Sequence, residues 1–203
     1  MTITNPSPPV QSIKFLLESV FGCIAYLREF YREEIFEQRK VGSLTVQRIS
    51  KGKSSQSDAL LDWLSNGCVD AISKGYLKAA ILTVVSDRKR PQQTVLEAYT
   101  VRISYKSDIQ NVNMVQNMTI ERSQGPNDHL SQNSQQSQEL RESITEFSQT
   151  SNRSFEKCAS LMLRSLCVLL QTLPPLPEKK YLAMHLAYHD ERTPASYEPP
   201  GFR

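Results

Sequence analysis

Residues 173–203 read LPPLPEKKYLAMHLAYHDERTPASYEPPGFR and carry the clearest fold signal in the chain. A helical pattern ends at Pro174, because proline cannot continue a helix, and a strand pattern runs from Tyr181 to the turn residues 190–194. Within that strand two sets of side chains alternate: Leu182, Met184, Leu186 and Tyr188 against Ala183, His185, Ala187 and His189. The alternation predicts a strand buried on one strongly apolar face.

The bulk properties of the chain exclude several classes of protein. At 203 residues it has room for one ordinary domain with a hydrophobic core. A formal net charge of +3 with 22% charged residues argues against a dedicated nucleic-acid or membrane-surface module. The first ten residues, MTITNPSPPV, lack the features of a secretory signal, and no apolar run is expected to span a bilayer. Four cysteines without a C-x-x-C pair predict reduced, buried thiols, and we expect a nuclear or cytosolic protein.

Helical spacing of apolar residues predicts three amphipathic helices. They run from Ile13 to about Tyr31, from an N-cap at Ser57 to Gly75, and from about Ser154 to Pro174. Between the first and second helices, residues 32–40 are charged and are expected to form a solvated exit. Residues 41–49 show only the weak alternation of a short strand.

Two strands are predicted between the second and third helices. Leu77 to Val85 is apolar at nearly every position, which indicates a strand covered on both faces. Val95 to Tyr105 alternates, with Glu97 as the exception, and the two form a predicted antiparallel hairpin. Residues 107–152 are then rich in Ser, Gln and Asn and predict a disordered insertion, although its first apolar residues could extend the sheet. Residues 1–9 are expected to be a flexible leader.

The assembled order of elements predicts an α+β domain with three helices against one face of a mainly antiparallel sheet. Residues 10–203, apart from the insertion, resemble the HORMA domain of meiotic chromosome-axis proteins. The resemblance is carried by the end segment from Leu173 and by CIAYLR at Cys23 to Arg28. DWLSNGCVDAI at Asp62 to Ile72 and the strand from Leu77 to Val85 are also similar to this branch.

This resemblance implies a binding function without catalysis, cofactor, metal, membrane or small-molecule substrate. The resemblance implies that a short closure-motif peptide, from another axis protein or from the same protein, binds as an added strand, and that a C-terminal safety belt wraps around it. The strand edges beside 95–105 and 181–188 are the candidates, and family topology favours the former, with Val101, Ile103 and Tyr105 near the peptide. The family places the protein in the nucleus, on chromosomes, where it supports homologue pairing, synapsis, recombination and checkpoint signalling. Most of the belt is expected to lie beyond residue 203.

Ser-Gln pairs in the insertion suggest a second function. They are found at Ser123, Ser131, Ser134, Ser137 and Ser148. DNA-damage kinases prefer Ser-Gln targets, and phosphate groups would make a neutral segment acidic. A segment rich in Ser and Gln also produces such pairs by composition alone, so both interpretations stay open.

Other readings of the sequence are weaker alternatives. Arg88, Lys89 and Arg90 form a basic loop that could contact DNA phosphates, which makes direct DNA binding, as opposed to indirect association with chromatin, the main alternative. A checkpoint-type or translesion-type HORMA adaptor is a further one. His185 and His189 lie about 13 Å apart along a strand, too far to share one metal ion. No nucleophile has an activating context, so catalysis is not expected.

Overall fold

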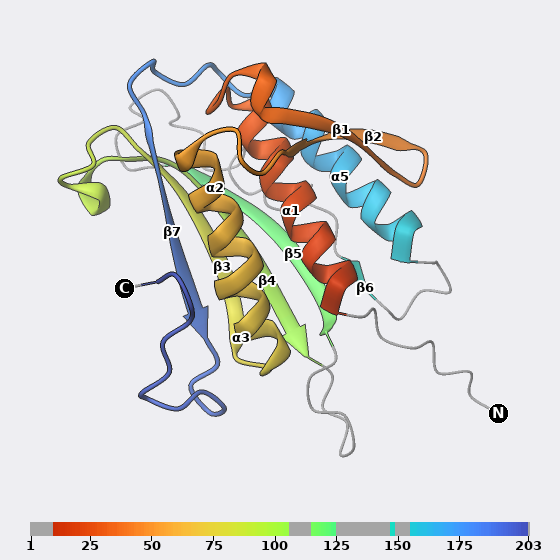
Figure 1. The fold of residues 1–203 in the computed structure, drawn as a ribbon, viewed down its shortest axis with the longest axis vertical. Coiled ribbons are helices and arrows are strands. Elements are labelled where there is room, and N and C mark those ends of the chain that lie inside the picture. The colour runs from red at the N-terminus through yellow and green to blue at the C-terminus, as the bar shows by residue number, and fades with distance from the viewer. Residues whose placement is uncertain (1–9, 106–114, 125–146, 149–154, 203) are drawn as a thin grey trace, which may run out of the picture.

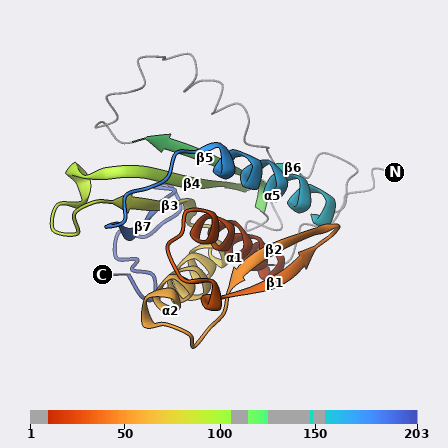
Figure 2. The same cartoon turned by 90° about the horizontal axis from the view of Figure 1, so that it is seen from above.

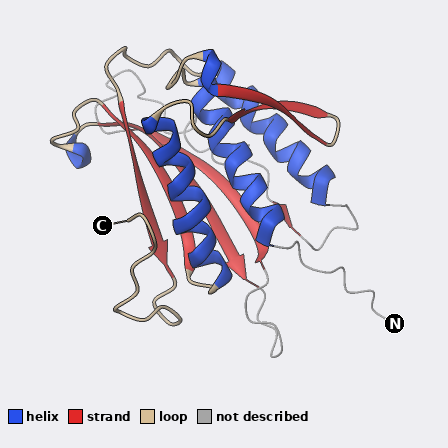
Figure 3. Ribbon diagram, in the orientation of Figure 1, coloured by secondary structure: helices blue, strands red, loops and turns tan. Residues whose placement is uncertain are grey.

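A five-stranded antiparallel sheet forms the centre of the molecule (Figures 1 and 3). The computed structural model describes residues 10–105, 115–124, 147–148 and 155–202. The strands of the sheet are β3 (Leu77–Val85), β4 (Val95–Tyr105), β5 (Val115–Gln124), β6 (Phe147–Ser148) and β7 (Tyr181–Tyr188). Their order across the sheet is β6-β5-β4-β3-β7. The predicted hairpin of β3 and β4 is confirmed, with Leu82 opposite Tyr99.

Three helical segments cover one face of this sheet, as the sequence predicts. Seen from above, α1 and α2 lie on one side of the strands, and α5 lies beside α1 (Figure 2). The segments are α1 (Val10–Leu27), the continuous run α2 (Ser55–Asp62), η2 (Trp63–Cys68) and α3 (Val69–Ser73), and α5 (Phe155–Thr172). Their apolar faces meet the sheet in one core, where Leu16, Leu64 and Leu163 are each at most 1% exposed. Burial of these faces is the main source of stability in such a layer.

Two predicted helix boundaries are shifted by local backbone geometry. The first helix ends at Leu27 and not at Tyr31, because Glu29 adopts a left-handed conformation with φ of 55°. The N-cap of the second helix is Ser54, whose side chain accepts a hydrogen bond from the backbone N–H of Gln56, and not Ser57. The predicted stop at Gly75 is confirmed: its φ of 73° ends the helix.

The charged stretch after α1 is exposed to solvent, as expected, but its second half is a strand and not an irregular exit from the helix. Beyond a short 3-10 turn, η1 (Glu33–Ile35), a hairpin is formed by β1 (Phe36–Val41) and β2 (Leu44–Ile49). Four of the six β1 residues, 37–40, are exposed, so no buried face reveals the strand in the sequence. The hairpin is held by main-chain pairing with β2, which packs on α1.

Part of the predicted disordered insertion belongs to the sheet. Strand β5 pairs with β4 along its length, from Glu97 opposite Gln124 to Tyr105 opposite Val115, and β6 pairs with β5. The prediction of disorder is therefore wrong for 115–124 and 147–148, whereas the expectation that apolar residues of the insertion extend the sheet is confirmed at Val115, Met118 and Ile120. The rest of the insertion and the expected leader at 1–9 lie outside the described residues.

Helix α1 also corrects an expectation about membranes. Its 18 residues are long and apolar enough to cross a bilayer by length and composition, but 61% of them are buried inside the protein. The helix is apolar because it is the central helix of the core, in contact with β2 and α5. The four cysteines form no disulfide; Cys23 and Cys68 are buried, whereas Cys158 and Cys167 are only half-buried.

Candidate functional site

Strand β7 forms one border of the sheet. It pairs with β3 on its inner side, from Tyr181 opposite Val85 to Tyr188 opposite Leu77. On its outer side it has no strand partner within the described part of the chain. An edge of this kind presents a row of main-chain N–H and C=O groups with which another strand can pair.

The side chains of β7 alternate between two faces as predicted, but on the apolar face only Met184 is buried, while Leu182, Leu186 and Tyr188 are half-buried. Leu182 and Met184 lie opposite Val84 and Leu82, which have no exposed surface, and so face the helices. His185 belongs to the other face and is exposed, while His189 follows the end of the strand. Among the described residues no group of three His, Cys, Asp or Glu side chains is close enough to hold a metal ion.

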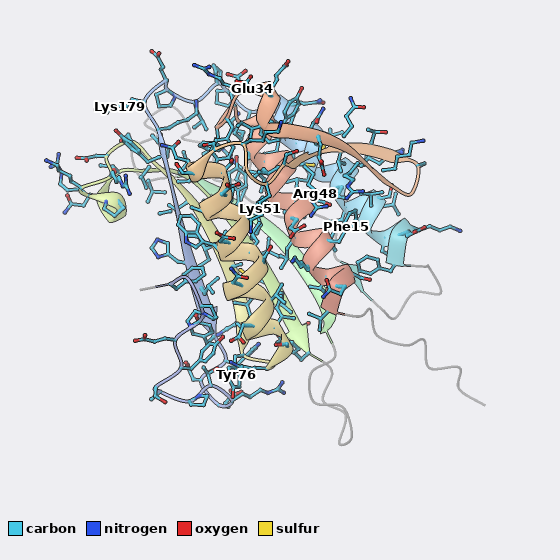
Figure 4. The ribbon with its side chains drawn as sticks, viewed as in Figure 1. Phe15, Glu34, Arg48, Lys51, Tyr76 and Lys179 are labelled. Carbon is cyan, nitrogen blue, oxygen red and sulfur yellow. The ribbon has the colours of Figure 1, made fainter. Side chains whose placement is uncertain are left out.

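After β7 the chain turns back and ends beside this strand (Figure 1). The turn is held by hydrogen bonds to the carbonyl of His189 from the backbone and hydroxyl of Thr193. Tyr197 then packs edge-on against Tyr76 and Tyr188, with ring centroids 5.0 and 5.4 Å away. Figure 4 labels Tyr76 at this end of β7.

The hydroxyl of Tyr197 donates a hydrogen bond of 2.7 Å to Asp70 Oδ2, which also accepts from Lys74 Nζ at 2.8 Å. Burial, with the neighbouring Asp70 carboxylate, raises the pKa of Tyr197. Burial opposes ionisation of Asp70, but the two hydrogen bonds outweigh it, and the pKa of Asp70 is lowered. The returning segment is thus fixed to α3 by a charge-assisted hydrogen bond.

Phe202 lies over a notch in the second helical run. Its ring centroid is 6.3 Å from that of Trp63, and its ring covers Gly67 in the π-helical segment η2. A Cβ atom at Gly67 would lie 2.3 Å from Phe202 Cε2, which no real contact allows. The absence of a side chain at Gly67 therefore makes room for Phe202.

The predicted peptide edge at β4 is corrected by the sheet order. Val101 pairs with Ala80 of β3 and with Ile120 of β5, so the main chain of β4 is hydrogen-bonded on both sides at this point. Val101 and Ile103 are buried in the core. Tyr105 instead donates its hydroxyl to the carbonyl of Leu77 at 3.0 Å. The prediction is wrong because the strand that occupies this edge, β5, comes from the insertion that appeared disordered.

A buried ionic cluster, which the sequence did not reveal, fixes β4 to its surroundings. Glu97 accepts bonds of 3.1 and 2.8 Å from Arg28 Nε and Nη2, and one of 2.8 Å from Arg122 Nη2. Tyr99 donates its hydroxyl to the same carboxylate at 2.5 Å, and burial and the Glu97 charge raise the pKa of Tyr99. Arg28 also donates to the carbonyl of Pro174 at 2.8 Å. The cluster joins the end of α1, β4, β5 and the link to β7; its only sequence signal is the break in alternation at Glu97.

The basic loop between β3 and β4 is only partly available to a ligand. Arg90 Nε lies 3.3 Å from Asp87 Oδ2, and the backbone N–H of Lys89 donates to Asp87 Oδ1 at 2.8 Å. Arg88 is exposed and has no ion pair within the described residues. Of the three predicted phosphate contacts, only Arg88 also lines a cavity.

The Ser-Gln serines do not share one environment. Ser123 lies in β5 opposite Ala98, and Ser148 lies in β6 opposite Asn117. These two backbones are therefore part of the sheet, and the expectation that they belong to a flexible segment is wrong. Ser131, Ser134 and Ser137 lie outside the described residues.

Known proteins share the sequence pattern and the fold of this chain. Residues 9–203 match the HORMA domain family. The chain is 30% identical over 202 residues to HORMA domain-containing protein 1 of Danio rerio, covering 99% of this chain and 49% of that protein. It is 29% identical over 203 residues to HORMA domain-containing protein 2 of Mus musculus, covering 99% of this chain and 57% of that protein. The chain thus spans about half the length of these relatives.

Solved structures share the fold. C. elegans HTP-2 bound to HTP-3 closure motif 1 superposes with a TM-score of 0.67 at 17% identity, covering 99% of this chain and 74% of that one. C. elegans HTP-1 bound to HIM-3 closure motif gives a TM-score of 0.65 at 15% identity, covering 96% and 75%.

Proposed function

The chain belongs to the HORMA domain family, and on that premise we propose that it is a non-enzymatic adaptor that binds closure-motif peptides at the outer edge of β7. The open main-chain edge of Tyr181–Tyr188 is the observation that carries this proposal. A peptide that adds there as a strand gains hydrogen bonds from the row of N–H and C=O groups, and pockets beside the edge select its side chains. The proposed site is the second of the two edges expected from the sequence.

Two features of the chain support this location. The edge strand is held firmly, because β7 pairs from end to end with β3, seven of whose nine residues are buried. The returning segment, residues 189–202, already lies beside the same strand and is fixed by Tyr197 and Phe202. A chain continuing from this segment would start next to a bound peptide, where a belt could hold it. Slow release of the peptide then follows, since escape requires local unfolding.

The biological setting is proposed from the family. C. elegans HTP-2 and HTP-1 have been solved with closure motifs of HTP-3 and HIM-3, and we infer a similar class of partner for this chain. The protein would then act in the nucleus on meiotic chromosome axes, where it recruits other axis proteins for pairing, synapsis, recombination and checkpoint signalling. Contact with chromatin would be indirect. Phosphorylation of the Ser-Gln serines by DNA-damage kinases stays a prediction.

Fluorescence anisotropy with labelled peptides from meiotic axis proteins tests the proposal. Each peptide that binds is remade with N-methyl groups at alternate residues, in two complementary sets. Strand addition requires that one set abolishes binding, because its N–H groups pair with β7, and that the other set has little effect. Equal effects of both sets, or no binding by any axis peptide, would refute the proposal.

Direct DNA binding, the main alternative, predicts a different salt dependence. Contacts to phosphates release counterions, so affinity for duplex DNA would fall steeply with salt concentration. Peptide binding through main-chain hydrogen bonds should change little over the same range. Measuring both ligands between 50 and 200 mM salt, roughly the range in which phosphate contacts lose most affinity, separates the two functions.

A further inference from the structure

A cavity of about 280 Å³ lies beside the start of β7. Phe30 and Tyr31, which follow α1, and Trp63 of η2 form its aromatic wall. Tyr181 and Leu182 of the edge strand complete it. The three aromatic side chains of this wall are half-buried, and partial burial raises the pKa of Tyr31 to about 12. The cavity is large enough for one bulky side chain and is lined by the first two residues of β7, the strand along which the peptide is proposed to bind.

Two cations belong to the same cavity. Arg88, from the β3–β4 loop, is exposed and has no ion pair with any described residue. Lys180 lies immediately before β7, with its Nζ 5.8 Å from the centroid of the Phe30 ring. Lys179 adds a third positive charge at this end of the strand, where Figure 4 labels it.

No described carboxylate forms an ion pair with Arg88 or Lys180, and two nearby aspartates are engaged by other groups. Asp87 is engaged by the backbone N–H of Lys89 and by the Arg90 side chain, and these contacts, with Lys179, lower its pKa. Asp62 lies 3.3 Å from Lys51 Nζ. Arg88 and Lys180 therefore lie beside the aromatic wall without an ion pair among the described residues, and an acidic group of a ligand can pair with them.

We propose that this cavity is the specificity pocket of the peptide site and takes a bulky apolar side chain, preferably aromatic, from a peptide with an acidic residue beside it. The inference rests on the proposed function, because pairing with β7 is what brings the peptide to the cavity. The peptide's ring packs on Trp63 and Phe30, and its carboxylate pairs with Arg88 and Lys180. A peptide fits these walls better than DNA, since two cations around an aromatic hollow match one carboxylate and not a run of phosphates.

Selection from a display library of extended peptides tests the inference on the full chain. Peptides retained by the wild type should be enriched in an aromatic residue next to Asp or Glu. The double variant Arg88→Glu, Lys180→Glu should weaken binding of these acidic peptides by about tenfold, because two attractive contacts become repulsive. The same variant should select peptides with Lys or Arg beside the aromatic residue. Lys89→Glu, on the same loop but outside the cavity wall, is the matched control and should keep the wild-type preference.

The outcomes separate the inference from the proposed function. If the library yields peptides that depend on main-chain N–H groups but show no charge preference and no response to the double variant, the pocket assignment is wrong and strand addition stands. If no peptide is retained, both fail. If labelled duplex DNA binds the wild type with steep salt dependence and the double variant abolishes it, the cations serve DNA and the inference is overturned. Quenching of Trp63, the single tryptophan of the chain, by an acidic aromatic peptide supports the inference directly.

Discussion

Substituting Glu97 by alanine tests the buried ionic cluster. The carboxylate is 3% exposed and accepts bonds from two guanidinium groups, those of Arg28 and Arg122, which are 5% and 9% exposed. Removing it leaves two buried cations without their partner, and breaking a buried pair in this way costs about 3–5 kcal/mol. Against a total unfolding free energy of about 5–15 kcal/mol, this is a large loss. For a chain of this size the melting temperature should fall by about 6–20 °C.

Urea unfolding, followed by circular dichroism, measures the effect. Arg122→Met is the informative control, because it leaves Glu97 with both bonds from Arg28 and should cost only about 1.5–3 kcal/mol. If Glu97→Ala changes the unfolding free energy by less than about 1 kcal/mol, the carboxylate is solvated and the reasoning is refuted. A large effect of Glu97→Ala with none from Arg122→Met would show that β5 does not pack against the cluster.

Two further predictions concern the returning segment after β7. Gly67→Ala should expel the Phe202 ring, because the new methyl group would overlap it. The fluorescence of Trp63 should then shift toward that of a solvated indole. An unchanged spectrum would show that the Phe202 ring does not lie against Gly67. Asp70→Asn should destabilise the protein near neutral pH and not in acid. The folded-state pKa of Asp70 is lowered, so its ionic contribution is present above the ordinary value of 3.8 and is lost as the pH falls through the folded-state value. Urea unfolding at pH 7 and pH 3 should show the gap between wild type and variant closing in acid, whereas Tyr197→Phe should remove only the hydrogen bond.

The sequence predicted best the elements that are buried on one face. The alternation of β7 and the apolar run of β3 were visible because each strand packs against the core. Strand β1 was not predicted because residues 37–40 are all exposed, so the strand shows no alternation of apolar and polar side chains. Its conformation is set by pairing with β2. The composition of a segment does not show which other strand it pairs with.

The site was harder to predict than the fold. In the sequence Glu97 only interrupts the alternation of its strand, because its partners Arg28 and Arg122 are distant along the chain. The peptide edge was assigned to β4 because β5 resembles a disordered segment: its sequence, VQNMTIERSQ, is largely polar. Which edge of a sheet remains open depends on strand order, and strand order is a long-range property of the chain.

The position of β7 also determines when the domain can be completed during synthesis. Strands β3, β4 and β5 follow one another along the chain and can pair as soon as they have left the ribosome. Tyr188 pairs with Leu77, and the two residues are separated in the sequence by β4, the insertion and α5. A contact with such a large sequence separation should form late. Until then the main-chain N–H and C=O groups on this edge of β3 have no strand partner, and the nascent chain is exposed to wrong strand pairing. The strand whose outer edge is the proposed peptide site is thus the one that completes the sheet last.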